Sequence, residues 1–197
     1  MKTDVTPNTW YLPHFGIDNP NKSKLRLVFD AAGKVNGSCL NDYLLTGPDL
    51  LSSILGIMLR FRERKIAVTG DIKDMFLRVK VHAEDQHALR FLWRSSPTDR
   101  IKTYVMTSLI FGANCSPFVA QFIKNKNVRG YESSSPAEVN AIYHSHYMDD
   151  YIDSVPDETT AIELVKNISD IHKSGGFEIR NRTSNSVAVL DSVPKET

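Results

Sequence analysis

The sequence has few of the features expected of a secreted or membrane protein. It contains only two cysteines, Cys39 and Cys115, and their spacing matches neither a disulfide framework nor a metal-binding motif. Residues 1–7 lack the apolar core of a signal peptide. No apolar run reaches the roughly 18–20 residues needed to cross a bilayer. We therefore expect an intracellular protein, in the cytoplasm or associated with a particle, that does not bind membranes.

Repeats, low-complexity tracts and a large net charge are also absent. The 24 Lys and Arg residues against 23 Asp and Glu leave a net charge of +1, which by itself neither predicts nor excludes a nucleic-acid partner. The charge is unevenly distributed, however. Residues 1–130 carry 19 basic and 11 acidic residues (+8), and residues 131–197 carry 5 and 12 (−7). This division suits a protein that contacts a polyanion with one part and binds cations with the other. Chance segregation explains it equally well.

The periodicity of apolar residues predicts a mixture of helices and strands. Residues 65–72 form a β-branched run typical of a buried strand, and residues 157–174 keep a helical period that Gly175 ends. The other predicted elements are strands over 24–30 and 177–180, a hairpin of 88–93 with 102–106, strand-like alternation over 75–81, and helices over 48–61, 116–123 (with Ser116 as its cap) and 137–142.

Two adjacent aspartates, Asp149 and Asp150, follow Tyr147 and Met148 inside a short apolar and aromatic run. A bound divalent cation would explain why unpaired carboxylates lie next to apolar residues. The alternative is a turn in which aspartate makes local hydrogen bonds. The pair alone does not decide between the two.

A third carboxylate, Asp71, ends the predicted strand over 65–72, which is a common position for an active-site residue. It could equally cap the next turn. A different metal site, of the hydrolase type, would use His144 and His146 together with the Asp149–Asp150 pair, since alternating histidines on a strand share a face. The neighbouring motifs explain the pair better than this alternative does.

The order of these motifs resembles the fingers and palm of reverse transcriptases, most closely those of BEL/Pao-type LTR retrotransposons. The resemblance covers residues 10–195. The passages that carry it are Tyr11-Leu12-Pro13-His14, Leu25-Arg26-Leu27-Val28-Phe29-Asp30-Ala31, Phe111-Gly112 with Ser116-Pro117-Phe118, Tyr147-Met148-Asp149-Asp150, Gly175-Gly176-Phe177-Glu178-Ile179-Arg180, Ser184-Asn185-Ser186, and Val189-Leu190 with Val193-Pro194.

The resemblance implies an α+β polymerase right-hand fold, with an antiparallel ferredoxin-like palm sheet, helices on one of its faces, and no thumb. Residues 1–64 would form the fingers hairpin and connecting helix, and residues 65–197 the palm, with a fingers-like insertion at 82–110. The implied reaction is template-directed DNA synthesis from dNTPs by two-metal phosphoryl transfer with Mg²⁺, for which Mn²⁺ can substitute. Implied partners are an RNA or DNA template with its primer, dNTPs, and the rest of a Gag-Pol-type polyprotein.

The resemblance also implies roles for individual residues. Asp71, Asp149 and Asp150 would be the catalytic metal ligands, and the carbonyl of Ile72 an additional one. The ring of Phe76 would fill the space that a ribose 2′-hydroxyl needs and so select deoxyribonucleotides. The remaining implied contacts are to the dNTP, from Lys22 or Lys24, Arg26, Gly112, Ser116 and Pro117, and to the primer, from Tyr147 and Met148.

The sequence departs from the family pattern at a few positions. Phe111 replaces the glutamine that precedes the loop glycine in many viral relatives, and no lysine matches the proposed proton donor to pyrophosphate. Arg180 and Arg182 lie nearby, but arginine holds its proton too tightly for that role. These departures bear on rate and fidelity more than on the type of reaction. The expected lack of a thumb instead favours the alternative function, a catalytically inactive or co-opted retroelement fragment that only folds or binds nucleic acid.

Overall fold

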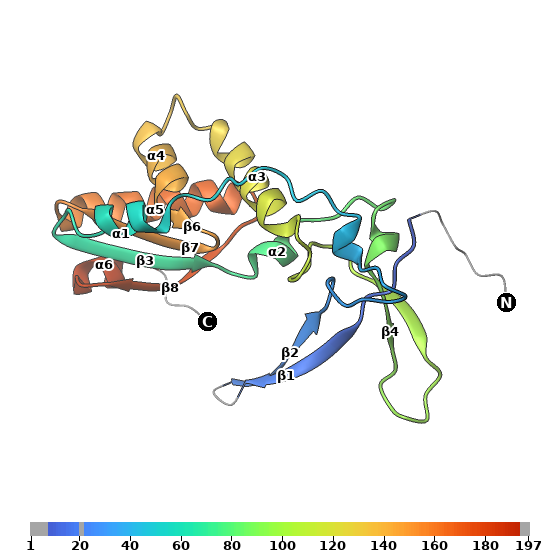
Figure 1. Ribbon diagram of the computed structural model, residues 1–197. Coiled ribbons are helices and arrows are strands. Elements are labelled where there is room, and N and C mark those ends of the chain that lie inside the picture. The colour runs from blue at the N-terminus through green and yellow to red at the C-terminus, as the bar shows by residue number, and fades with distance from the viewer. Residues whose placement is uncertain (1–7, 20–21, 194–197) are drawn as a thin grey trace. The chain divides into compact units, whose positions relative to one another are not determined.

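The structure is a computed structural model that describes residues 8–19 and 22–193 (Figure 1). For residue 19 and residues 22–26 it describes the backbone but not the side chains. The chain divides into two compact units. Unit 1 consists of Met1–Gly47 and Phe76–Ser116, and unit 2 of Pro48–Met75 and Pro117–Thr197. Within the described residues, no helix has both the length and the apolar character needed to span a membrane.

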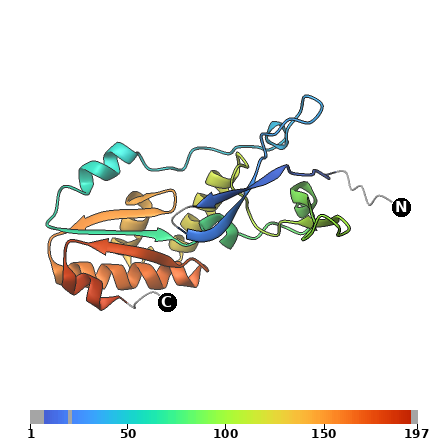
Figure 2. The same ribbon diagram turned by 90° about the horizontal axis from the view of Figure 1, so that it is seen from below.

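Unit 2 is built on a four-stranded antiparallel sheet with strand order β6-β7-β3-β8. The strands are β3 (Ile66–Ile72), β6 (His146–Tyr147), β7 (Asp150–Val155) and β8 (Ile179–Ser184). Figure 2 shows β7, β3 and β8 side by side. Every second residue of β3 is buried, because successive side chains of a strand point to opposite faces and one face is covered by the core.

Five helices belong to unit 2 or begin at its edge. They are α1 (Ile54–Arg60), α3 (Ser116–Arg129), α4 (Pro136–His144), α5 (Glu158–Ser174) and α6 (Val187–Ser192). Helix α5 packs on β3 and β7. Its buried residues Val165, Ile168 and Ile171 follow the helical period, and the Asp157 side chain caps it by accepting from the Thr160 N–H.

Unit 1 contains two antiparallel hairpins. One pairs β1 (His14–Asn19) with β2 (Lys22–Phe29), and the other pairs β4 (Arg90–Trp93) with β5 (Lys102–Val105). Short helices lie at Leu40–Asp42 and Gln86–Leu89, and α2 (Met75–Arg78) begins at the boundary between the units. The hydrophobic core of unit 1 consists of Leu12, Phe29, Ala31, Leu40, Leu89, Ile110 and Ala113.

The predicted mixture of helices and strands is confirmed, but three predicted elements differ. The strand predicted over 177–180 begins only at Ile179 and continues to Ser184. Residues 75–81, predicted as strand-like, begin with helix α2, because Val79 lies four positions after Met75 and three after Phe76, and all three are buried. The helix predicted over 48–61 begins only at Ile54, where Ser53 caps it by accepting from the Gly56 N–H.

Gly112 occupies a position that a side chain would disturb. Its φ of +96° lies in the left-handed region, and a Cβ there would approach the Phe29 carbonyl oxygen to 2.7 Å. Its carbonyl accepts from the Asn41 side chain, which holds this loop to the unit 1 core. This environment gives the glycine a structural role, independent of any contact with a nucleotide.

Gly112→Ala is expected to lower the free energy of unfolding by about 2–4 kcal/mol, the sum of backbone strain and the clash with Phe29. Denaturant unfolding measures the change. Gly37→Ala is the matched control, because Gly37 also has a positive φ (+88°) but nothing within 4 Å of a Cβ. Equal losses for the two variants would show that the approach to Phe29 does not matter.

Candidate active site

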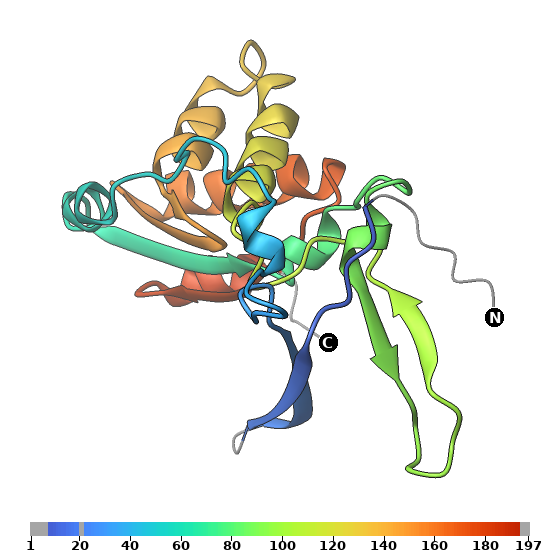
Figure 3. The same cartoon turned by 45° about the vertical axis from the view of Figure 1, so that its right-hand side comes forward.

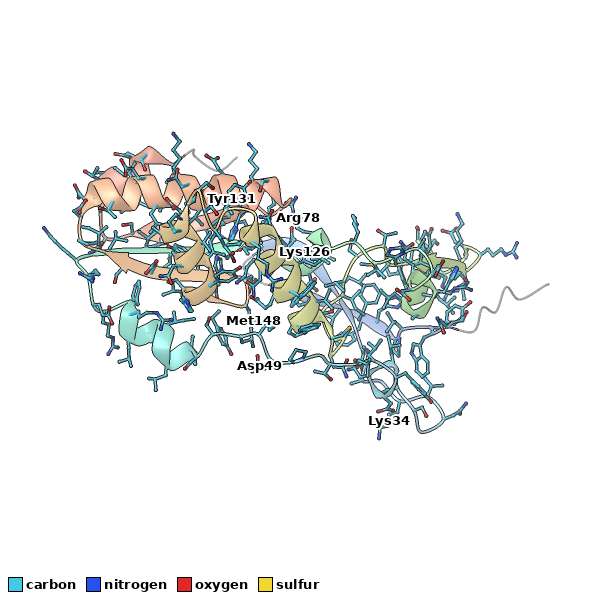
Figure 4. All side chains as sticks on the ribbon, turned by 90° about the horizontal axis from the view of Figure 1, so that it is seen from above. Lys34, Asp49, Arg78, Lys126, Tyr131 and Met148 are labelled. Atoms are coloured by element: carbon cyan, nitrogen blue, oxygen red, sulfur yellow. The ribbon has the colours of Figure 1, made fainter. Side chains whose placement is uncertain are left out.

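The strand register of unit 2 brings three aspartates to one end of the sheet. Asp71 of β3 is the direct partner of Asp150 of β7. Tyr147 of β6 pairs with Asp150, so Met148 and Asp149 form the turn between β6 and β7 (Figure 4). The Ile72 N–H donates to the Asp149 carbonyl at 2.8 Å, which ties this turn to the end of β3.

The neighbours of Asp71 in the chain position it. The Ile72 side chain is fully buried, which anchors the end of β3. Gly70 leaves room for β8, since a Cβ at that position would come within 2.8 Å of the Ile179 side chain. A glycine followed by an aspartate and a large apolar residue therefore lets two strands approach closely beside the carboxylate.

The surroundings of Asp150 favour its protonated form. Burial, followed by the charges of Asp149 and Asp71, raises the pKa of the Asp150 carboxyl. A divalent cation among the three would remove this repulsion, and carboxylate oxygens are the ligands that Mg²⁺ prefers. The donor set therefore fits a divalent ion chemically.

Asp71 nevertheless has other partners in this structure. Arg180 of β8 donates to its Oδ2 at 3.2 Å, and the Asn181 side chain donates to its Oδ1. Across the described part of the chain, no three His, Cys, Asp or Glu side chains are grouped in a way that could hold a metal ion. A cation shared with the other two aspartates would compete with Arg180 and Asn181 for the Asp71 oxygens.

A buried glutamine supports the turn that carries Asp149. Met148 has a φ of +55°, which is uncommon for a residue with a side chain. Gln121 of α3, only 2% exposed, donates from its side chain to the Met148 carbonyl at 2.9 Å. Gln121 is not among the site residues predicted from the sequence. The available signal was a polar residue next to Ala120 on the apolar face of a predicted helix.

A buried basic cluster lies behind the same hairpin and consists of Lys124, His146 and His172. The two imidazoles are joined through their Nε2 atoms at 3.0 Å, and burial is the main cause that lowers the pKa of each, to about 3 for His172. Lys124 donates to the Ile142 carbonyl at 3.4 Å, and burial lowers its pKa to about 7. His144 ends α4 with an exposed side chain, so the hypothesis of a shared face with His146 is wrong.

Lys124→Met is expected to stabilise the protein by about 1–4 kcal/mol at pH 7, because it removes a charged group from the core. The folded-state pKa of Lys124 lies below the unfolded value, so the unfolded chain binds the extra proton between pH 7 and 10.5. The advantage of methionine should therefore be full below pH 7 and vanish as the pH rises through 10.5. Thermal unfolding at pH 6.5 and 10.5 measures it, and an equal advantage at both pH values would contradict the prediction.

The remaining predicted site residues are distributed over both units. In unit 1, Phe76 is buried and its ring packs edge-on against Phe111, with ring centroids 4.7 Å apart. Ser116 is the first residue of α3 and not the predicted cap before it, and its buried hydroxyl donates to the Ile110 carbonyl at 2.7 Å. Pro117 lies in the first turn of α3. Lys22, Lys24 and Arg26 lie in β2, and their side chains are outside the described part of the structure.

Comparison with known proteins gives one family match and several structural neighbours. A family model described as "Reverse transcriptase (RNA-dependent DNA polymerase)" matches residues 20–187. No curated protein matches the chain.

Three solved foamy virus structures are similar to this chain. The protease-reverse transcriptase in complex with RNA/DNA hybrid has a TM-score of 0.66 at 18% identity, over 89% of this chain and 21% of that one. The dRH form in complex with ds DNA has a TM-score of 0.63 at 20% identity, over 86% of this chain and 26% of that one. The CSH mutant of the prototype foamy virus protease-reverse transcriptase has a TM-score of 0.64 at 18% identity, over 88% of this chain and 20% of that one. The chain thus spans about a quarter or less of these proteins, and the likeness shows the fold.

Proposed function

Because this chain belongs to the reverse transcriptase (RNA-dependent DNA polymerase) family, we propose that it is the fingers and palm part of an enzyme that synthesises DNA on an RNA or DNA template. Unit 2, with its antiparallel sheet, would be the palm, and unit 1, with its two hairpins, the fingers. Residues 48–64, which the sequence analysis groups with the fingers, lie in unit 2.

The observation that carries this proposal is the pairing of Asp71 with Asp150 next to the turn that holds Asp149. These three carboxylates, with the Ile72 carbonyl, would hold two divalent cations. When bound, such ions stabilise the attacking and leaving oxygens of phosphoryl transfer. The donor set fits them, since burial and then the charges of Asp149 and Asp71 raise the pKa of Asp150, and a bound cation would offset that repulsion.

The protein's own residues prepare this site. Gln121 holds the Met148–Asp149 turn in its strained conformation, so Asp149 is positioned before any ligand binds. Arg180 neutralises the charge of Asp71, the Asn181 amide donates to it, and both would release it to a cation. Tyr147 and Met148, which precede the aspartates, would contact the primer strand, whose 3′-hydroxyl attacks the α-phosphate of the incoming dNTP as pyrophosphate leaves.

The assignments for the nucleotide remain those that the family resemblance implies. Phe76 would exclude the ribose 2′-hydroxyl, and the edge-on contact with Phe111 would support its ring. The other proposed dNTP contacts are Lys22 or Lys24, Arg26, Gly112, Ser116 and Pro117. A BEL/Pao-type retrotransposon origin, a place within a Gag-Pol-type polyprotein, and a cytoplasmic or particle-associated location are proposed on the same resemblance.

One observation favours the alternative function of an inactive fragment that folds or binds nucleic acid. Both oxygens of Asp71 accept from β8 residues in this structure, so Arg180 and Asn181 compete with a cation for the third carboxylate. If Arg180 and Asn181 hold Asp71 permanently, the site lacks a ligand. The two functions differ in what they predict for metal-dependent synthesis.

Primer extension on an RNA template separates them. The assay is run with Mg²⁺ or Mn²⁺, both on this chain and on a longer polypeptide that contains it. The proposed function predicts metal-dependent incorporation of dNTPs by the longer polypeptide. Binding of template–primer with no incorporation under either metal would instead support the inactive fragment.

A further inference from the structure

Strands β4 and β5 form a hairpin in unit 1 (Figure 3). One face of this hairpin carries aromatic side chains that the proposed chemistry does not use. Phe91 is the direct partner of Tyr104, and Trp93 is the direct partner of Lys102. Directly opposite residues of an antiparallel pair project to the same side of a sheet. These four side chains therefore form one surface, which we call the aromatic face.

Packing at its inner end fixes this aromatic face. Phe91 packs edge-on against Phe29 of the unit 1 core, at a centroid distance of 5.1 Å, and stacks on Tyr104 at 5.7 Å with an interplanar angle of 25°. His14 of β1 lies against both Phe91 (5.5 Å) and Trp93 (6.0 Å). The rings are thus ordered before any partner binds.

Two rings of the aromatic face are exposed at both ends of the face, Tyr104 opposite Phe91 and Trp93 opposite Lys102. Trp93 is 43% and Tyr104 44% exposed, which is unusual for large aromatic side chains that are held by neighbours. Exposed rings on a rigid base offer flat surfaces for stacking at little cost in conformational entropy. A partner with flat faces of its own therefore fits this surface.

The charge of the hairpin indicates the chemistry of that partner. Residues 90–105 contain four basic residues, Arg90, Arg94, Arg100 and Lys102, and one acidic residue, Asp99, a net charge of +3. Unit 1 as a whole carries 11 basic and 7 acidic residues (+4). Aromatic rings combined with cations are typical of surfaces that bind single strands, in which bases stack on rings and phosphates contact cations. A duplex hides the faces of its bases, so it cannot stack in this way.

We propose that the aromatic face binds single-stranded nucleic acid, with unpaired bases stacked on Trp93 and Tyr104 and phosphates contacted by Lys102 and Arg100. The inference rests on the proposed function for the identity of the strand, which is the unpaired part of a template. The binding itself requires only the hairpin and its charge.

Titration with a fluorescein-labelled 12-mer of deoxythymidylate, followed by anisotropy, tests this proposal. Trp93→Ala and Tyr104→Ala are each expected to weaken binding about 5- to 100-fold, which corresponds to the loss of one stacked base. Leu92→Ala is the matched control, because Leu92 is 47% exposed on the same strand but projects to the opposite face, and it should bind like the wild type. Lys102→Ala should reduce the slope of log affinity against log salt by about one.

A second measurement observes stacking directly. The sequence has two tryptophans, so Trp10→Phe leaves Trp93 as the only one. Its fluorescence should be quenched saturably by the single strand and much less by a 12-base-pair duplex. Trp93→Phe, which keeps a ring, should retain most of the affinity and thereby separates stacking from a folding defect.

Three results would overturn the inference. Equal binding by the Trp93→Ala and Leu92→Ala variants would show that the aromatic face is not the site. Equal quenching by the duplex would exclude stacking of unpaired bases. If the wild type self-associates in sedimentation and Trp93→Ala does not, without any effect on oligonucleotide binding, the face is a contact between copies of this chain. A wild type that binds the oligonucleotide through Trp93 but never extends primers would refute the proposed function alone.

Discussion

Asp149→Asn should lower the rate of primer extension about a thousandfold or more in the longer polypeptide that contains this chain. Asp149 lies at the turn beside the paired Asp71 and Asp150, so its carboxylate would contribute to both charge and geometry of the proposed cation site. Stabilisation by such ions is worth several kcal/mol in the transition state, and each 1.4 kcal/mol is a factor of about ten in rate. Asparagine has nearly the same shape as aspartate, so the loss of extension rate would result from the missing negative charge of residue 149.

The measurement is single-turnover extension of a labelled primer at saturating Mg²⁺. Asp170→Asn is the control, because Asp170 is exposed on α5 in the same unit and its loss changes the net charge equally. A readout without catalysis is the thermal midpoint with and without Mg²⁺, which should rise with the ion in the wild type and the control but not in Asp149→Asn. If the Asp149→Asn variant extends primers as fast as the control, the assignment of the metal ligands is wrong.

Phe76→Val should raise the use of ribonucleotides relative to deoxyribonucleotides about 100-fold. The buried ring of Phe76 would occupy the space of a ribose 2′-hydroxyl, and valine removes most of it. The readout is the ratio of kcat/KM for a ribonucleotide to that for the matching deoxyribonucleotide, measured on one enzyme preparation. A ratio does not depend on how much of the variant is folded.

The control for this variant is Phe111→Leu. Both substitutions remove the edge-on contact between the two rings, and each should cost stability, about 2–3 kcal/mol for Phe76→Val and less for Phe111→Leu. Only Phe76→Val should change the nucleotide ratio substantially. Unchanged discrimination in Phe76→Val, or an equal change in Phe111→Leu, would mean that Phe76 is a core residue and does not select the sugar.

Elements whose burial follows a local period could be predicted from the sequence. Strand β3 and helix α5 occur where the β-branched run and the 3.6-residue period predict them, because each buries one regular face. Helix α2 could not be predicted. Its four residues fit a strand as well as a helix, and only the core that surrounds Met75 and Phe76 selects the helix.

The partners of the candidate site could not be predicted in the same way. The three aspartates were identified from motifs that are local in the chain. Arg180 and Asn181, which bond to Asp71, lie 109 and 110 residues away from it, and His172, which bonds to His146, lies 26 residues away. Such pairs depend on strand register and helix packing, and no local pattern encodes either.

The sequence by itself determined the family, the main helices and strands, and the choice of Asp71, Asp149 and Asp150 as candidate ligands, since all of these depend on local order and composition. The tertiary structure decided which of these residues face one another. The register of β3 places Asp71 opposite Asp150, and the approach of β8 gives Asp71 a competing arginine and amide. The packing of α3 sets Gln121 under the turn. These contacts form only once strands distant in the chain pair in one register, because burial of their apolar faces selects that register.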